Sequence, residues 1–83
     1  MAVQTHINVT VDFRKWNEST YDLRIPIHQT VKYLLKNLVE TLRIEAYDTS
    51  NYVIKVVNKS MLLTDDDRLV DHKVTDGDIL KVL

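Results

Sequence analysis

One stretch of the chain has the residue spacing of an amphipathic helix, and this feature constrains the fold most. Between Thr30 and Leu42, apolar residues recur at intervals of three and four, which places them on one face of an α-helix. They are Val31, Leu34, Leu35, Leu38, Val39 and Leu42. The hydroxyl of Thr30 is expected to cap the helix N-terminus. A helix with such a stripe must bury it against a second layer, which the rest of the chain has to supply.

The first part of the chain is patterned as two strands. Apolar and polar residues alternate from Val3 to Phe13 and again over residues 20–27, as they do in strands with one buried face. The polar segment 14–19 between them predicts an antiparallel hairpin with a long loop. Pro26 has no backbone N–H to donate, so the second strand is expected at a sheet edge.

The part after the helix predicts shorter elements. Residues 52–57 are predicted to form a strand and residues 61–63 a short return strand. Between them Asn58 opens a tight turn, because asparagine tolerates a positive φ better than other non-glycine residues. Residues 68–74 are expected to add two apolar side chains to the core through a single helical turn.

The last apolar stretch, residues 79–83, predicts a final strand. Gly77 precedes it, as a turn with an unusual backbone angle requires. Leu80 and Val82 are expected to face inward, and the first and last strands, which are the most apolar, are expected to lie side by side at the centre. The sequence therefore predicts one domain, residues 1–83, with an α+β roll in which a mixed sheet of four or five strands packs on the helix.

The composition excludes several classes of protein. There is no cysteine, so disulfide scaffolds, thiolate zinc sites and thiol nucleophiles are excluded. A net charge of -1 provides no field that would attract nucleic acid. No apolar run is long enough to span a membrane, and no signal segment is seen at the N-terminus. We expect a cytoplasmic protein that neither binds nucleic acid nor inserts into a membrane.

Residues suited to catalysis or metal binding do not occur in a recognisable pattern. His6, His28 and His72 lack metal-ligand spacing; the first two are expected in solvent, and His72 is expected to bond a backbone group. The acidic segments 65–67 and 76–78 resemble calcium loops but lack the closing glutamate, so we interpret them as solvated loop or turn residues. We predict no enzyme, no metal and no cofactor, and hence a binding module.

Two features are candidates for protein binding. Trp16 lies in the first hairpin loop, and aromatic residues are enriched at interface hot spots, although the indole could equally fold back onto the sheet edge. The outward residues of the strands at 52–57 and 79–83 would form an apolar patch ringed by lysine stems if these strands are neighbours, although single exposed apolar residues are common. The predicted protein-binding residues are Trp16, Thr10, Val53, Lys55, Val57, Ile79, Lys81 and Leu83.

Four short segments carry a family resemblance over the length of the chain. They are residues 9–13 (VTVDF), 20–23 (TYDL), 67–71 (DRLVD) and 76–80 (DGDIL), and in this order they resemble the YukD/EsaB family of small ubiquitin-like proteins encoded with type VII secretion systems of Gram-positive bacteria. The resemblance implies a β-grasp fold. It also implies a cytoplasmic accessory protein, needed for export of small helical-hairpin effectors, that docks onto protein components of the membrane-embedded secretion machinery.

The same fold also serves protein modifiers and sulfur carriers, which form the alternative function. Conjugation requires a flexible tail that ends in two glycines, whereas Val82 and Leu83 are expected in the final strand. Lys55 falls where the receptor patch of ubiquitin has its central isoleucine, so ubiquitin receptors are not expected to bind. We therefore expect a non-conjugating adaptor whose exposed sheet face contacts a secretion subunit or pairs two copies in a homodimer.

Overall fold

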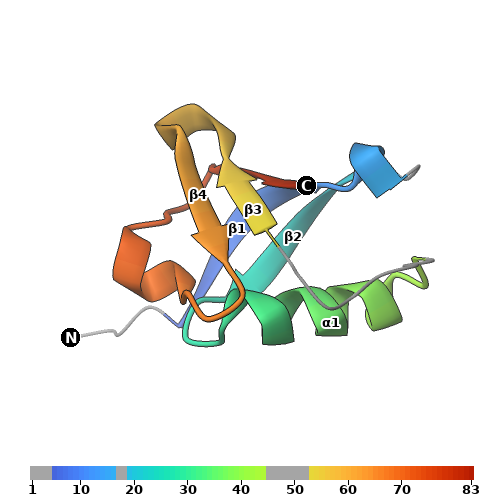
Figure 1. Cartoon of the computed structure of the whole chain (residues 1–83), viewed down its shortest axis with the longest axis horizontal. Coiled ribbons are helices and arrows are strands. Elements are labelled where there is room, and N and C mark those ends of the chain that lie inside the picture. Colours follow the sequence, from blue (N-terminus) through green and yellow to red (C-terminus); the bar gives the residue numbers. More distant parts are fainter. Residues whose placement is uncertain (1–4, 17–18, 45–52) are drawn as a thin grey trace.

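A five-stranded mixed sheet with an α-helix across one of its faces makes up the described part of the chain (Figure 1). The computed structural model describes residues 5–16, 19–44 and 53–83. The elements are β1 (His6–Asp12), η1 (Arg14–Trp16), β2 (Thr20–Pro26), α1 (Val31–Thr41), β3 (Val53–Val56), η2 (Val57–Lys59), β4 (Met61–Thr64), η3 (Leu69–His72) and β5 (Ile79–Val82), where η marks a 3₁₀ helix. The predicted α+β roll is confirmed.

The strand order is β2-β1-β5-β3-β4. β1 and β5 are parallel neighbours, as predicted for the first and last strands, and the remaining pairs are antiparallel. β2 lies at one edge, where Pro26 costs the sheet no ladder hydrogen bond. The central position of β5 means that the sheet is complete only when the end of the chain has paired with strands on both sides.

The sequence-based boundaries need few changes. Val3 and Tyr52 lie outside the described residues, and Val57 begins η2 instead of ending the strand. The prediction that Asn58 adopts a positive φ is wrong, because Ser60 takes the left-handed conformation instead, with φ 51°. The side chain of Asn58 has another role: Nδ2 donates to Asp78 Oδ1 at 2.7 Å and Oδ1 accepts from the backbone N–H of Ile79 at 3.1 Å.

The N-terminus of α1 is capped by two parts of the chain. The backbone N–H groups of Val31 and Lys32 donate to the carbonyl oxygens of Asp67 (2.8 Å) and Asp65 (3.1 Å), and that of Tyr33 donates to Thr30 Oγ1 (3.3 Å). The predicted cap by Thr30 is therefore confirmed, and the acidic loop supplies the remaining acceptors. Negative charge beside the first turn also suits the helix dipole.

The C-terminus of α1 ends in a Schellman motif. Arg43 has φ 55°, and its N–H donates to the carbonyl of Glu40, while the N–H of Ile44 donates to the carbonyl of Val39 at 3.0 Å. Ile44 and Val39 are both buried, so the motif turns the chain back onto the core. Ile44 thus belongs to the core.

The core lies between α1 and the inward side chains of the sheet. Four residues of the helix stripe are buried, whereas Leu38 and Leu42 at its end are only partly buried. On β1, β3 and β5 the inward residues at alternate positions are buried, as the alternation predicted, whereas on β2 only Ile25 is buried. The fully buried side chains of the helix and sheet include Ile7, Val11, Ile25, Val31, Leu35, Ile54, Val56, Leu63 and Leu80.

The different burial of two helix leucines gives a test of this packing. Leu35 is 0% exposed, so Leu35→Ala should lower the free energy of unfolding by about 2–5 kcal/mol through lost contacts and a residual cavity. Leu38→Ala removes the same atoms from a partly exposed site and should cost clearly less. Urea unfolding of the two variants beside the parent protein measures this, and equal losses would contradict the described position of α1.

Candidate protein-binding site

The side of the sheet that faces away from α1, here called the outer face, carries seven of the eight predicted binding residues. They are Thr10, Val53, Lys55, Val57, Ile79, Lys81 and Leu83. The inward neighbours along these strands, such as Ile54 and Leu80, are buried, so the residues between them point outward. No element of the described part of the chain covers the outer face (Figure 1).

The strand register places these residues beside one another. Lys55 of β3 lies opposite Lys81 of β5, and Thr10 of β1 lies opposite Ile79 of β5. The N–H of Leu83 donates to the carbonyl of Val53 at 3.0 Å, which extends the ladder past the end of β5. The two strands that the patch requires are therefore neighbours, and Val57, Ile79 and Leu83 are exposed on it.

Leu62 is an outer-face residue that the sequence reasoning missed. It lies on β4 opposite Lys55, and 61% of its surface is exposed, while the adjacent Leu63 is buried. It is thus the most exposed aliphatic side chain of the described residues. Inward and outward residues alternate along β4, so Leu62 could have been placed on the outer face once the register of β4 with β3 was known.

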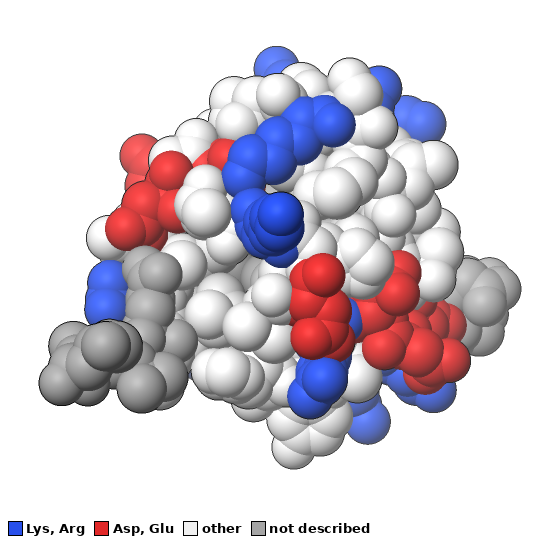
Figure 2. Space-filling view, turned by 90° about the vertical axis from the view of Figure 1, so that its left-hand side faces the viewer, with Lys and Arg blue, Asp and Glu red and all other residues white. Residues whose placement is uncertain are grey.

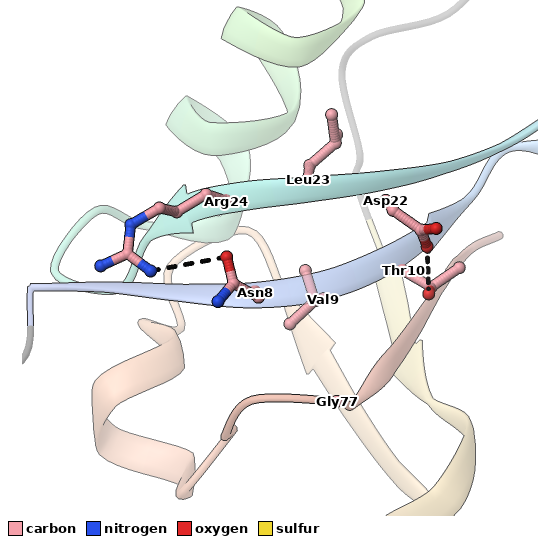
Figure 3. Close-up of a pocket in the computed structure, with 7 residues that line it drawn as sticks. All are labelled: Asn8, Val9, Thr10, Asp22, Leu23, Arg24 and Gly77. Atoms are coloured by element: carbon pink, nitrogen blue, oxygen red, sulfur yellow. Dashed lines mark hydrogen bonds between the residues drawn. The ribbon is translucent and has the colours of Figure 1, made fainter.

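A hollow of about 360 Å³ lies over the β1–β2 hairpin at the other end of the outer face. Two cross-strand pairs border it: Thr10 Oγ1 donates to Asp22 Oδ1 at 2.7 Å, and Arg24 donates through Nη1 to Asn8 Oδ1 at 3.4 Å (Figure 3). Its lining is completed by Val9, Leu23 and Gly77. Thr10 therefore joins the apolar patch to a polar region, and its hydroxyl is already bonded to a carboxylate.

Trp16 folds back onto the ends of the central strands β1 and β5, and not onto an edge strand. Its ring meets Phe13 edge-on with centroids 5.9 Å apart, and its Nε1 donates to the carbonyl of Leu83 at 3.3 Å. Of the two alternatives for this residue, the packed one is confirmed. A role in binding stays a prediction, and Trp16 lies beside the outer face at the end of β5.

A buried carboxylate links the turn that follows β3 to the turn that precedes β5. Asp78 is 2% exposed and accepts from Asn58 Nδ2 (2.7 Å), the Thr75 N–H (2.9 Å) and Lys59 Nζ (2.8 Å). Burial raises the pKa of Asp78, but the donors outweigh it, and the pKa lies below its ordinary value. Since Asn58 and Lys59 follow Val57, and Ile79 follows Asp78, this network fixes two residues of the outer face.

The other perturbed carboxylates also have structural partners. Arg14 donates through Nε and Nη2 to the buried Asp12, and this holds the pKa of Asp12 below its usual value, with a smaller effect of the Lys81 charge. The pKa of Asp67 is lowered, first by the N–H of Thr64 at 2.8 Å. Each of these groups is therefore ionised and bonded, and none is poised to exchange a proton near neutral pH.

The two acidic segments brace the fold. Asp76 Oδ1 accepts from the N–H of Asn8 at 2.8 Å, so segment 76–78 supports β1, whereas segment 65–67 caps α1. His72 Nε2 lies 3.4 Å from Asp67 Oδ1. His72 was predicted to bond a backbone group, and its observed partner is this carboxylate instead.

On the side of the molecule that carries η3, acidic side chains form separate groups with basic ones between them (Figure 2). Within the described residues, no group of three or more metal-ligating side chains occurs.

No helix among the residues that the structure describes is long and apolar enough to cross a membrane.

Comparison with known proteins gives a consistent result over nearly the whole chain. Residues 6–82 match the family model described as "WXG100 protein secretion system (Wss), protein YukD". The type VII secretion system accessory factor EsaB of Staphylococcus aureus (strain Newman) is 44% identical over 78 residues, which cover 94% of this chain and 96% of that protein. The ESX secretion system protein YukD of Bacillus subtilis (strain 168) is 28% identical over 78 residues, 94% of this chain and 99% of that protein.

Solved structures with the same fold are ubiquitin-like. A ubiquitin-like domain of an Arabidopsis thaliana protein matches with a TM-score of 0.67 and 21% identity, covering 100% of this chain and 81% of that one. A chain from a study of molecular mimicry of SUMO in DNA repair matches with a TM-score of 0.76 and 20% identity, covering 99% and 95%. At this identity the matches show the fold alone, and the predicted β-grasp fold is confirmed.

The Asp78 network predicts a clear difference between two aspartate variants. Asp78→Ala leaves Asn58, Lys59 and the Thr75 N–H without their acceptor and should cost about 1–3 kcal/mol of unfolding free energy, or more if several donors stay unsatisfied. Asp71→Ala is the control, since Asp71 forms an exposed ion pair with Arg68 and should cost under about 1 kcal/mol. Chemical denaturation measures both, and equal effects would show that Asp78 does not hold the turns together.

The lowered pKa values of Asp12, Asp67 and Asp78 predict loss of stability in acid. Each group binds its proton less readily in the folded chain than in the unfolded chain. The stabilisation is therefore fully present above the unfolded-state pKa of about 4 and is lost as the pH falls through the lower folded-state values. Urea unfolding between neutral pH and about pH 3 should show this decline, and a flat profile would contradict the described carboxylate contacts.

Proposed function

This chain belongs to the YukD family of the WXG100 protein secretion system, and we propose that it is a non-catalytic adaptor that docks through its outer face onto protein components of a type VII secretion machine. The relative from Staphylococcus aureus is named as an accessory factor of such a system, which supports an accessory role here. We further propose that the chain acts in the cytoplasm and is needed for export of small helical-hairpin effectors.

The single observation that carries the proposal is the outer face itself. Leu62, Val57, Ile79 and Leu83 expose apolar surface on the side of the sheet that no described element covers. Exposed apolar side chains gathered on one face are typical of protein-interaction sites, because their burial in a complex releases water. The strand register holds these side chains in fixed positions before a partner arrives, which lowers the entropy cost of binding.

A non-catalytic role is supported by what the titratable groups do. Asp12, Asp67 and Asp78 each accept hydrogen bonds that hold a turn or a strand end, and their lowered pKa values suit permanent ionisation. A general acid or base works best with a pKa near the operating pH and with access to a substrate. None of these carboxylates has a pKa near neutral pH, and Asp12 and Asp78 are also buried.

The proposal includes action without conjugation. Val82 is buried, and Leu83 is bonded through both backbone groups, to the Val53 carbonyl and to the Trp16 indole. These contacts hold both residues against the sheet. Protein modification is the alternative function, and the mass measurement described below tests it.

Affinity capture from cytoplasm and membranes of the native host tests the proposal. The parent protein should recover identified type VII secretion subunits, and a double variant, Val57→Asp with Leu62→Gln, should recover at least about tenfold less because it removes two exposed apolar side chains of the outer face. Tyr33→Asp is the matched control, since Tyr33 is 58% exposed on α1 and should not affect recovery.

Two results would contradict the proposal. Undiminished recovery by the double variant, with a circular dichroism spectrum like that of the parent, would show that the outer face is not the docking surface. Intact-mass measurement of the captured chain should give its unmodified mass, and an adenylated form or an isopeptide-linked adduct would instead support a protein modifier.

A further inference from the structure

Two lysines face each other across neighbouring strands at the centre of the outer face. Lys55 of β3 and Lys81 of β5 are register partners, and both point outward. Like charges directly opposite in a sheet repel each other and destabilise the pairing. Both cations nonetheless lie at the same point, although the chain has a net charge of -1 and more acidic than basic residues.

Neither lysine forms a salt bridge with a carboxylate of the described residues. The nearest candidate is Asp12, which is the register partner of Lys81 on the β1 side. Asp12 is buried, however, and both of its oxygens accept from Arg14, so it affects Lys81 only through its charge. Lys59 is different, because its ammonium is bonded to Asp78, to the Lys73 carbonyl and to Thr75.

Apart from Asp12 on the β1 side, the neighbours of the lysine pair on the outer face are apolar. Leu62 is opposite Lys55 on the β4 side, and Ile79 lies two residues before Lys81 on the same face of β5. Val57 and Leu83 extend the exposed apolar surface along both strands. The outer face therefore presents two neighbouring cations beside exposed apolar side chains.

We propose that the outer face binds a protein segment that presents Asp or Glu carboxylates next to apolar side chains. A carboxylate placed between the ammonium groups of Lys55 and Lys81 would remove their repulsion and form charge-assisted hydrogen bonds with both. The apolar neighbours of that carboxylate would cover Leu62 and Ile79. This inference rests on the proposed function and specifies the chemistry of the secretion component that docks.

Other occupants fit the charges less well. A two-fold dimer through the outer face would bring the lysine pair of one copy against that of the other, since such interfaces are self-complementary. Nucleic acid or an anionic lipid surface requires a wider field of cations than two lysines whose neighbours are Leu62, Ile79 and the buried carboxylate of Asp12. These occupants become outcomes of the experiment.

The test uses three short synthetic peptides titrated into the isotope-labelled protein and followed by NMR. The peptides alternate leucine with glutamate, with glutamine or with lysine. The glutamate peptide should shift the backbone amide signals of Lys55, Leu62 and Lys81, and its affinity should fall as salt is raised. The glutamine peptide should bind at least about tenfold more weakly, and the lysine peptide should not bind.

Charge reversal gives the matched variants. Lys55→Glu with Lys81→Glu should lower the affinity for the glutamate peptide at least about tenfold, whereas Lys32→Glu with Lys36→Glu on the exposed face of α1 should leave it unchanged. Equal binding of the glutamate and glutamine peptides, or equal losses in both variants, would overturn the inference. The inference would also be overturned if the outer-face signals did not respond to the glutamate peptide and shifted instead with anionic lipid vesicles, with DNA or with rising protein concentration.

Failure of this inference can be told apart from failure of the proposed function. If the secretion subunits are captured through the outer face but the lysine reversal does not reduce their capture, the acidic partner is wrong and the adaptor role stands. If the glutamate peptide binds as expected but identified secretion subunits are not captured, the chemistry of the face is right and the adaptor role is wrong.

Discussion

The packing of α1 against only one face of the sheet is the constraint on which the rest of the structure depends. The stripe of Val31, Leu34, Leu35 and Val39 covers the inward side chains of the central strands. Among the residues that the structure describes, α1 is the single α-helix, and no comparable element lies over the other side of the sheet. The outer face therefore remains open to solvent, and the most exposed aliphatic side chains of the sheet are gathered there.

Charged residues contribute to this fold mainly by fixing turns. Asp78 accepts from Asn58 and so connects the η2 turn to the start of β5. Asp12 accepts from the backbone N–H of Arg14 just after β1. The 65–67 loop supplies carbonyl acceptors to the first turn of α1. Because these acids are engaged in the fold, their number does not indicate a catalytic or metal site. The lysines at the centre of the outer face are the exception, and their lack of a described carboxylate partner gives the open face its chemical character.

Much of the fold could be predicted because its pattern is local. The helix stripe, the alternation of β1 and the position of Gly77, with φ 87°, each depend on residues a few positions apart. Contacts between distant segments could not be predicted. Trp16 packs where it does because its indole donates to Leu83, 67 positions away. Leu62 and Leu63 are adjacent and identical, so only the register with β3 decides which one is exposed.

The central claim is that the outer face, and not the helix side, meets the secretion machinery. In the native host, a photo-reactive amino acid can replace Leu62 of β4 or Tyr33 of α1, which are both well exposed in the structure. Irradiation should link the chain to an identified type VII secretion subunit from position 62 and not from position 33. Crosslinks to that subunit from position 33 alone would contradict the account.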